Sequence, residues 1–286
     1  MTAKIIVAAH GDDESSRSAV ALGCELADAY DGELVLAGLW VSPLGAGDGL
    51  FELFIRDGIK RELEQLATTV PAGISCRRLV KGTHSLMSGL SREAQELAAD
   101  FIVFGPAHVA RGPSRLLGEK PMGAIHMAAA TVAVDPKGHT GRGDRDDVLV
   151  GWDESGGAVA ALEEGIRLVQ WTGGVLRIVC VLESPFRFTD AFMSDPTLAA
   201  GWSDELERWI NESLETALAS VDGRVPATTA MAEGQAGIRL AELGGEAAFI
   251  LTGSSGHGPI TRAMVGSTSV SLLHHATVPV IVMCRG

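Results

Sequence analysis

The sequence is one structural unit written twice, and this repeat limits the possible folds more than any other feature. Lys4–His10 is an apolar run that ends in a polar residue, and Asp147–Asp153 repeats that pattern. Phe101–Gly105 and Phe249–Gly253 form a second matching pair, each followed by a loop, a helical pattern and a last apolar run. Self-similarity of this kind predicts two copies of one fold.

The domain boundaries follow from the repeat. We expect a first domain over residues 1–137, a linker over 138–146 and a second domain over 147–286. The stretch between the copies is rich in glycine and charge and has no hydrophobic periodicity, which is typical of a linker. The offset from Phe101–Gly105 to Phe249–Gly253 is larger than the offset from Lys4–His10 to Asp147–Asp153. The second copy therefore carries a short insertion between its two runs.

Within each copy, short continuous apolar runs alternate with segments of helical spacing. Such runs are typical of parallel strands that are covered on both faces. The sequence therefore predicts an α/β fold with two tandem open, mainly parallel five-stranded sheets and helices on both faces. The predicted strands are Ile5–Ala8, Leu34–Leu39, Cys76–Val80, Phe101–Phe104, Val132–Val134, Val148–Gly151, Leu176–Leu182, Thr228–Ala232, Phe249–Thr252 and Val280–Met283. One predicted helix carries an apolar stripe of Leu206, Ile210, Leu214, Leu218 and Val221.

Composition and charge exclude several classes of function. The net charge of −13 argues against nucleic acid or an anionic membrane surface as a partner. No apolar run reaches the roughly 18 residues that a membrane span needs, and the first apolar stretch is too short for a signal peptide, so we expect a cytoplasmic protein. The 4 cysteines are far apart and form no C-x-x-C pair, so we expect neither a zinc site nor a disulfide framework.

A glycine-rich loop follows the fourth predicted strand of the second copy. Ligands of open α/β sheets bind beyond the carboxyl ends of the strands, where the strand order reverses. Gly253, Gly256 and Gly266 lie there, and Gly266 and Ser267 stand where the next helix begins. Glycines let the main chain approach an anion, and the first amides of a helix favour phosphate. Arg262 is the nearest cation. The loop therefore predicts a phosphate site.

This loop has two other interpretations. Gly266 can be a turn residue and Ser267 an ordinary N-cap, without any ligand. A P-loop is excluded, because that motif needs a lysine after its glycines and the chain has no lysine beyond Lys137. Main-chain amides and hydroxyl groups, rather than an ammonium group, are therefore expected to hold the phosphates.

The loop also resembles a known signature. Gly253, two residues, Gly256, nine residues and then Gly266-Ser267 is similar to the nucleotide-binding signature of the universal stress protein family. The resemblance covers nearly the whole chain as a tandem pair. It implies an adenine nucleotide α-hydrolase-like fold in which the two copies join through their fifth strands as an internal pseudo-dimer. Further matching segments are Val150–Ser155, Ile178–Glu183, Ala232–Gly234 and Val278–Val282.

The resemblance implies ATP as the ligand, with or without Mg²⁺. Asp153 and Val181 would contact the base, and Gly253 would lie beside the ribose. Asp153 also has a structural interpretation, since an aspartate before Ser155 can cap the following helix. The residues implied to hold the phosphates are Gly256, Gly266, Ser267 and Thr268, with Arg262 in reach of a terminal phosphate.

The matching loop of the first copy departs from this signature. Gly105 is present, but His108 replaces the second glycine and Glu119 replaces the hydroxyl residue at the helix start. A carboxylate there would repel a triphosphate. His10 stands in place of Asp153. We expect no ATP in this half; a metal or another small ligand held by His10 and His108 is the minor alternative.

Together these features predict an ATP-binding stress-response protein in which the nucleotide is a regulatory or assembly ligand of the second half. We expect no catalytic residue and at most weak ATP hydrolysis, an adenine nucleotide as partner, and a homodimer. One alternative is a slow ATPase or other nucleotide-hydrolysing enzyme, for which Glu154 is a candidate base. The other alternative is an interaction module with both pockets empty.

Overall fold

The computed structural model describes residues 2–9, 13–41, 50–106, 130–135, 138–183, 196–254 and 266–284. Its strands are β1 (Lys4–Ala9), β2 (Glu33–Val41), β3 (Ser75–Thr83), β4 (Phe101–Phe104), β5 (Thr131–Val134), β6 (Val148–Gly151), β7 (Leu176–Leu182), β8 (Ala227–Glu233), β9 (Phe249–Gly253) and β10 (Val280–Met283). Its helices are α1 (Glu14–Ala29), α2 (Leu50–Ala67), α3 (Leu86–Leu97), α5 (Gly156–Thr172), α6 (Pro196–Val221), α7 (Ala236–Leu243) and α8 (Ser267–His275). Every predicted strand is present, close to its predicted bounds.

Each half is an open parallel sheet with its first strand in the middle. β1 pairs with β2 and β4, and β6 pairs with β7 and β9, in every case in parallel. The strand order is therefore β3-β2-β1-β4-β5 in the first half and β10-β9-β6-β7-β8 in the second. The order reverses beside β1 and beside β6, which are the positions where such folds bind ligands.

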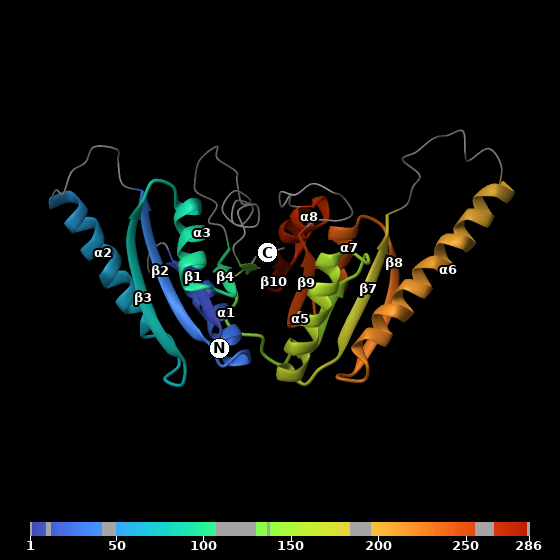
Figure 1. Ribbon diagram of the computed structural model, residues 1–286, viewed down its shortest axis with the longest axis horizontal. Coiled ribbons are helices and arrows are strands. Elements are labelled where there is room, and N and C mark those ends of the chain that lie inside the picture. The colour runs from blue at the N-terminus through green and yellow to red at the C-terminus, as the bar shows by residue number, and fades with distance from the viewer. Residues whose placement is uncertain are drawn as a thin grey trace.

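The two halves join into one sheet of 10 strands. β5 pairs antiparallel with β10, with Ala133 opposite Ile281. This pairing confirms the internal pseudo-dimer, and Figure 1 shows the halves on either side of it.

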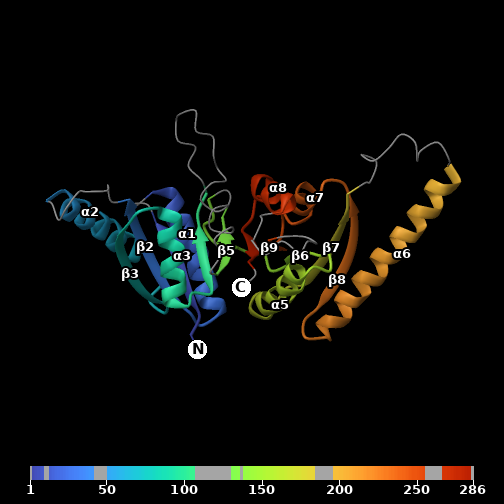
Figure 2. The same ribbon diagram turned by 45° about the horizontal axis from the view of Figure 1, so that its top comes forward.

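Helices cover both faces of the sheet (Figures 1 and 2). α1, α2, α5 and α6 pack in one core, and α3, α7 and α8 pack in the other. Strand residues alternate between the two cores, so that Ile5 and Val7 belong to the first and Ile6 to the second. The predicted stripe on α6 is wrong at Leu218, which is 40% exposed. Leu218 lies on the flank of the helix, about 80° from Ile210 at 100° per residue.

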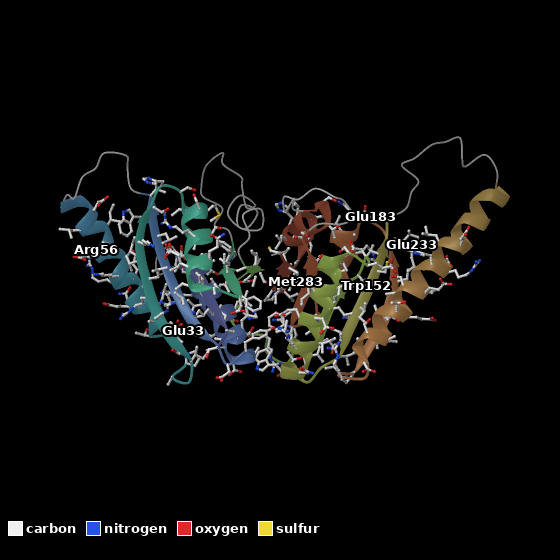
Figure 3. The ribbon with its side chains drawn as sticks, viewed as in Figure 1. Glu33, Arg56, Trp152, Glu183, Glu233 and Met283 are labelled. Atoms are coloured by element: carbon white, nitrogen blue, oxygen red, sulfur yellow. The ribbon has the colours of Figure 1, made fainter. Side chains whose placement is uncertain are left out.

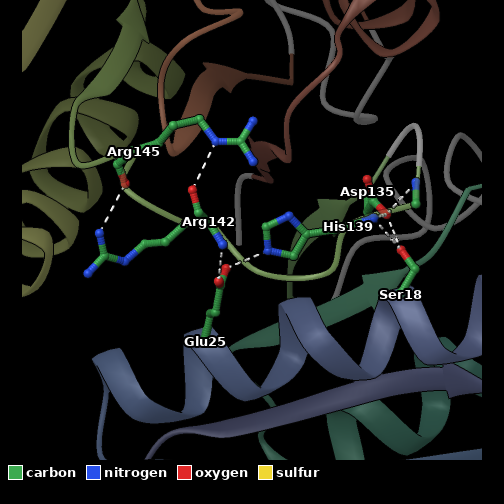
Figure 4. Close-up of polar contacts among 7 residues, drawn as sticks. Ser18, Glu25, Asp135, His139, Arg142 and Arg145 are labelled. Carbon is green, nitrogen blue, oxygen red and sulfur yellow. Dashed lines mark hydrogen bonds and ion pairs between the residues drawn. The ribbon is translucent and has the colours of Figure 1, made fainter.

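The segment between β5 and β6 is held on α1 (Figure 4). The buried carboxylate of Asp135 accepts hydrogen bonds from the Ser18 hydroxyl and the Gly138 amide. His139 Nε2 lies 2.7 Å from Oε2 of Glu25. No helix or strand occurs in the described part of this segment. The boundaries 1–137, 138–146 and 147–286 stay predictions.

Direct contacts between α1 and α5 also join the halves. The hydroxyl of Tyr30, just after α1, donates to the Glu164 carboxylate on α5. Trp171 Nε1 donates to Asp28 Oδ2 at 2.9 Å. The guanidinium of Arg142 lies 5.0 Å from the centre of the Trp171 ring. The junction therefore combines sheet pairing with helix contacts.

Candidate functional site

A cavity of about 200 Å³ lies at the carboxyl ends of β6, β7 and β9. It is beside β6, where the strand order of the second half reverses, as expected for a ligand site of this fold. Six of the eight predicted site residues line it together: Asp153, Val181, Gly253, Gly266, Ser267 and Thr268. Gly256 and Arg262 lie outside the described residues.

Other lining residues were missed by the sequence analysis: Gly151, Trp152, Val179, Ala236, Leu240, Thr252 and Ser269. At the end of β6, a Cβ on Gly151 would lie 2.9 Å from Cδ1 of Leu240, so a larger residue there would push on the cavity wall. The apolar patterns of β6 and β7 marked Gly151 and Val179 only as strand residues. Nothing in the sequence pattern pointed to a pocket role for Leu240, because α7 reaches the site through tertiary packing.

The N-terminus of α8 points its first amides at the cavity edge, but not all of them are available. Gly266 is the N-cap, and its N–H donates to the Ser254 carbonyl at 2.7 Å. The prediction that the Gly266 amide holds a phosphate is therefore wrong, because a protein carbonyl already uses it. Ser267 is the first helical residue rather than the N-cap. The amides of Ser267 and Thr268 have no acceptor among the described residues, as is usual in a first helical turn.

Side-chain bonds fix the position of this helix start. Ser269 Oγ donates to the Gly253 carbonyl at 2.9 Å. Ser254 is 1% exposed, and its own amide donates to the Met283 carbonyl on β10. The start of α8 is thus tied to the ends of β9 and β10, and its first amides are preorganised before any ligand arrives.

Main-chain packing explains why residue 253 is a glycine. A Cβ at this position would lie 2.9 Å from the Cα of Gly157, and a Cβ on Gly157 would lie 2.9 Å from the Cα of Gly253. The start of α5 therefore packs main chain against main chain on the end of β9. This contact accounts for glycine at both positions, and the ribose contact of Gly253 stays a prediction.

Asp153 serves the turn into α5. Its Oδ1 accepts a hydrogen bond from the Ser155 amide at 3.0 Å. Ser155 is the N-cap of α5, and its Oγ accepts from the Ala158 amide at 3.1 Å. Glu154 between them has φ 61°, a left-handed conformation that this turn requires. The prediction that Asp153 caps α5 is therefore wrong, because Ser155 is the N-cap; Asp153 Oδ1 instead holds the turn that leads into the helix. The exposed side chain of Asp153 also lines the cavity.

The main chain of Val181 faces the cavity. Successive residues of a strand direct their N–H and C=O groups to opposite neighbours. The Val179 carbonyl accepts from Trp152 N–H on the β6 side, and the Leu182 carbonyl accepts from Gly234 N–H on the β8 side. Val181 therefore faces the β6 side, beyond the last β6 pair, Gly151 with Val179. Neither of its main-chain groups has a main-chain partner among the described residues.

Trp152 connects the cavity to α6. It is 7% exposed, and its indole N–H donates to Ser213 Oγ at 2.9 Å. Figure 3 labels Trp152 within the second half, with Glu183 and Glu233 at the ends of the neighbouring strands. Glu183 caps α7, since its Oε1 accepts from the Ala236 amide at 2.8 Å. The negative charge of Glu183 is therefore matched by a helix N-terminus.

The charge balance of the site is simple. None of the described lining residues is basic, and Asp153 is the one acid among them. Cys180 lies nearby, where burial and then the carboxylates of Asp153 and Glu154 raise the pKa of its thiol. The described walls thus offer amides and hydroxyl groups to an anion.

The first half keeps the scaffold of this site. A Cβ on Gly105 would lie 1.9 Å from the Ser15 carbonyl oxygen at the start of α1. Asp13 is the N-cap of α1 and accepts from the Ser16 amide at 2.7 Å. The described residues contain no cluster of metal-ligating side chains, and the predicted positions His10, His108 and Glu119 lie outside them.

Two open α/β units, each with its strand order reversing beside its first strand, make up the doubly wound tandem fold that the sequence predicted. Residues 145–283 match the family model described as "Universal stress protein family", so the C-terminal half of the chain is a domain of that family. A comparison with curated protein sequences found no match.

Solved structures extend the likeness to the whole chain. A universal stress protein from Archaeoglobus fulgidus DSM 4304 aligns with a TM-score of 0.71 and 20% identity, over 99% of this chain and 98% of that one. A putative universal stress protein from Pseudomonas aeruginosa UCBPP-PA14 aligns with a TM-score of 0.64 and 15% identity, over 99% and 93%. At these identities the alignments establish the tandem fold. Within the described residues, no helix has the length and apolar character to cross a bilayer.

Proposed function

We propose that the C-terminal domain binds ATP as a regulatory or assembly ligand in a stress response. The observation that carries this proposal is the cavity beside β6, because it has main-chain donors at both of its ends. One end is the start of α8, and the other is the main chain of Val181, which extends beyond the last residue pair of β6 and β7. The family of the domain agrees with a nucleotide ligand, since its signature matches Gly253, Gly256 and Gly266-Ser267.

The phosphates belong at the start of α8. The amides of Ser267 and Thr268, together with their hydroxyl groups, meet an anion at the positive end of a helix dipole. Gly266 contributes by holding this turn in place rather than by donating to the ligand. Gly256 and Arg262 are proposed to complete the phosphate contacts.

The base belongs at the edge of Val181. An N–H and a C=O group on one residue, with no strand beside them, match the adjacent acceptor and donor of an adenine edge. Val179 and Leu240 supply apolar walls for the ring, and Asp153 lies where a ribose hydroxyl can donate to it. A guanine base presents a carbonyl where adenine has its amino group, so ATP should bind better than GTP.

Equilibrium dialysis with ATP, with and without Mg²⁺, tests this proposal. The wild type should retain ATP, and Ser267→Glu should weaken binding at least about tenfold, because a carboxylate then occupies the helix start. Thr277→Glu is the matched control, since it adds the same charge just beyond the other end of α8 at an exposed position. It should bind like the wild type.

Two outcomes would replace the proposal. No retention of ATP by the wild type beyond that of Ser267→Glu would favour an interaction module without a nucleotide. Steady-state turnover of several ATP per second, lost on Glu154→Gln, would make the protein an enzyme. Glu154 is exposed, and its left-handed backbone conformation belongs to the turn before α5, so Glu154→Gln should leave the fold intact.

A further inference from the structure

The ten-stranded sheet ends in two edge strands, β3 and β8, which lie toward opposite ends of the molecule (Figure 1). On β8 the direction of each main-chain group can be assigned. The Pro226 carbonyl accepts from Leu176 N–H, and Gly234 N–H donates to the Leu182 carbonyl. Residues of the same parity therefore face β7. The groups of Ala227, Thr229 and Met231 point outward, and no described residue bonds to them.

The two edges are protected differently. β3 carries three cationic side chains, each paired with a glutamate: Arg77 with Glu33 at 3.1 Å, Arg78 with Glu64 at 3.3 Å and Lys81 with Glu93 at 2.6 Å. Charged side chains are a common device against edge-to-edge pairing. From Ala227 to Ala232, β8 has no charged side chain, and Thr228, Thr229 and Ala230 are all exposed.

We propose that β8 is the dimerisation edge of this protein and that its occupant is β8 of a second copy, paired antiparallel. A single unguarded edge favours an isologous pair, because a two-fold axis closes the assembly, whereas two open edges would permit filaments. The uncharged strand also lets two chains of net charge −13 approach without repulsion at the contact. The chain already uses this type of pairing once, between β5 and β10.

The outward groups limit the register of the pair, because they must face the outward groups of the second copy, and we place the axis at the middle one of Ala227, Thr229 and Met231. With the two-fold axis at Thr229, this residue faces its own copy as a hydrogen-bonded pair, and Ala227 faces Met231 of the second copy. About six main-chain hydrogen bonds result. Thr228 then lies opposite Ala230 of the second copy, so that only small side chains meet where the strands are closest. The sheet would continue across the dimer.

Sedimentation equilibrium of the full chain over a wide dilution series tests the contact. The wild type should be a dimer that dissociates on dilution. Thr229→Pro removes an outward N–H and no internal ladder bond, so it should raise the dissociation constant at least about tenfold while the melting profile stays close to the wild type. Thr229→Lys should do the same by placing like charges opposite each other. A wild type that is monomeric throughout, or variants that dimerise like it, would overturn the proposal.

Cross-linking tests the register separately. A hydrogen-bonded antiparallel pair separates its Cα atoms by about 5.5 Å, which suits a disulfide. Thr229→Cys should therefore give a covalent dimer under mild oxidation. Thr228→Cys is the matched control, because Thr228 faces Ala230 and not itself. Equal cross-linking of both variants, or of neither, would contradict the register with Thr229 on the axis. ATP binding does not enter either readout, so this proposal and the nucleotide proposal fail separately.

Discussion

The two halves of the chain pack their first helix on the sheet in the same way. A Cβ on Gly23 in α1 would lie 2.6 Å from Cγ2 of Val7, and a Cβ on Gly165 in α5 would lie 2.7 Å from Cγ2 of Val150. The glycine at this point lets the helix approach the first strand closely in both halves. The spacing of helix and sheet therefore belongs to the shared fold and is independent of what either pocket binds.

The glycine after the fourth strand belongs to the fold as well. Gly105 and Gly253 both meet the main chain at the start of the first helix, at Ser15 and Gly157 respectively. The halves differ at later positions of the signature, where Glu119 in the first half stands in place of Ser267. The comparison teaches that the first glycine of the motif is required for packing, whereas under the proposed function the residue at the helix start determines whether a phosphate can bind.

The halves also differ directly after their first strands. Trp152 is buried beside the pocket in the second half, and Ala9 occupies the matching position of the first. The most damaging predicted substitution, Trp152→Ala, makes the second half resemble the first at this point. It should lower the free energy of unfolding by about 3–5 kcal/mol, because it leaves a cavity and deprives Ser213 of its donor. Urea denaturation measures this loss.

Val159→Ala is the control for Trp152→Ala. Val159 lies on α5 and is 47% exposed, so its truncation should change stability by less than about 0.5 kcal/mol. If Trp152→Ala cost no more than this control, the second half would not depend on the indole, and the contrast with Ala9 would have no energetic meaning.

The next largest effects test the shared glycines. Gly105→Ala and Gly253→Ala should each lower the free energy of unfolding by about 2–3 kcal/mol, because the added Cβ meets main-chain atoms that cannot rotate away. Gly105→Ala should be the more severe of the two, given its shorter contact. Thermal and urea melts of both variants decide the matter, with Gly58→Ala as the control, since a Cβ there meets nothing within 4 Å. A tolerated Gly105→Ala would break the parallel between the halves.

All ten strands were predictable because continuous apolar runs are a local property of the sequence. The hydrogen bond of the Gly266 amide could not be predicted, because its acceptor is the Ser254 carbonyl, which tertiary packing brings into reach. Leu218 was misplaced for a related reason, since helical spacing defines a stripe but not its width. The cavity-lining role of Trp152 had no sequence signal beyond its place before Asp153.

A smaller effect separates the two roles of Asp153. In Asp153→Asn the side-chain oxygen can still accept from the Ser155 amide, so the turn into α5 and the stability should be retained. If the carboxylate also accepts from a ribose hydroxyl, ATP affinity should fall about tenfold, the equivalent of 1.4 kcal/mol. Calorimetric titration measures it, and Asp144→Asn in the segment between the halves is the control. Unchanged affinity would leave Asp153 with the structural role alone.

The smallest predicted effect concerns the contact between the halves. Glu164 is buried on α5, where the matching residue of α1 is Leu22, and burial raises the pKa of its carboxyl above the ordinary value of 4.5. A raised folded-state pKa contributes stability that is full below pH 4.5 and is lost as the pH rises through the folded-state pKa. Glu164→Gln does not titrate and can still accept from the Tyr30 hydroxyl. Its stability relative to the wild type should therefore improve from pH 4 toward pH 7, as measured by urea denaturation at each pH.

Glu163→Gln on the exposed side of the same helix should show the reverse trend, because the Arg224 guanidinium lowers the pKa of that carboxyl. Parallel pH profiles for the two variants would mean that the junction between the halves leaves Glu164 as well solvated as a surface carboxylate.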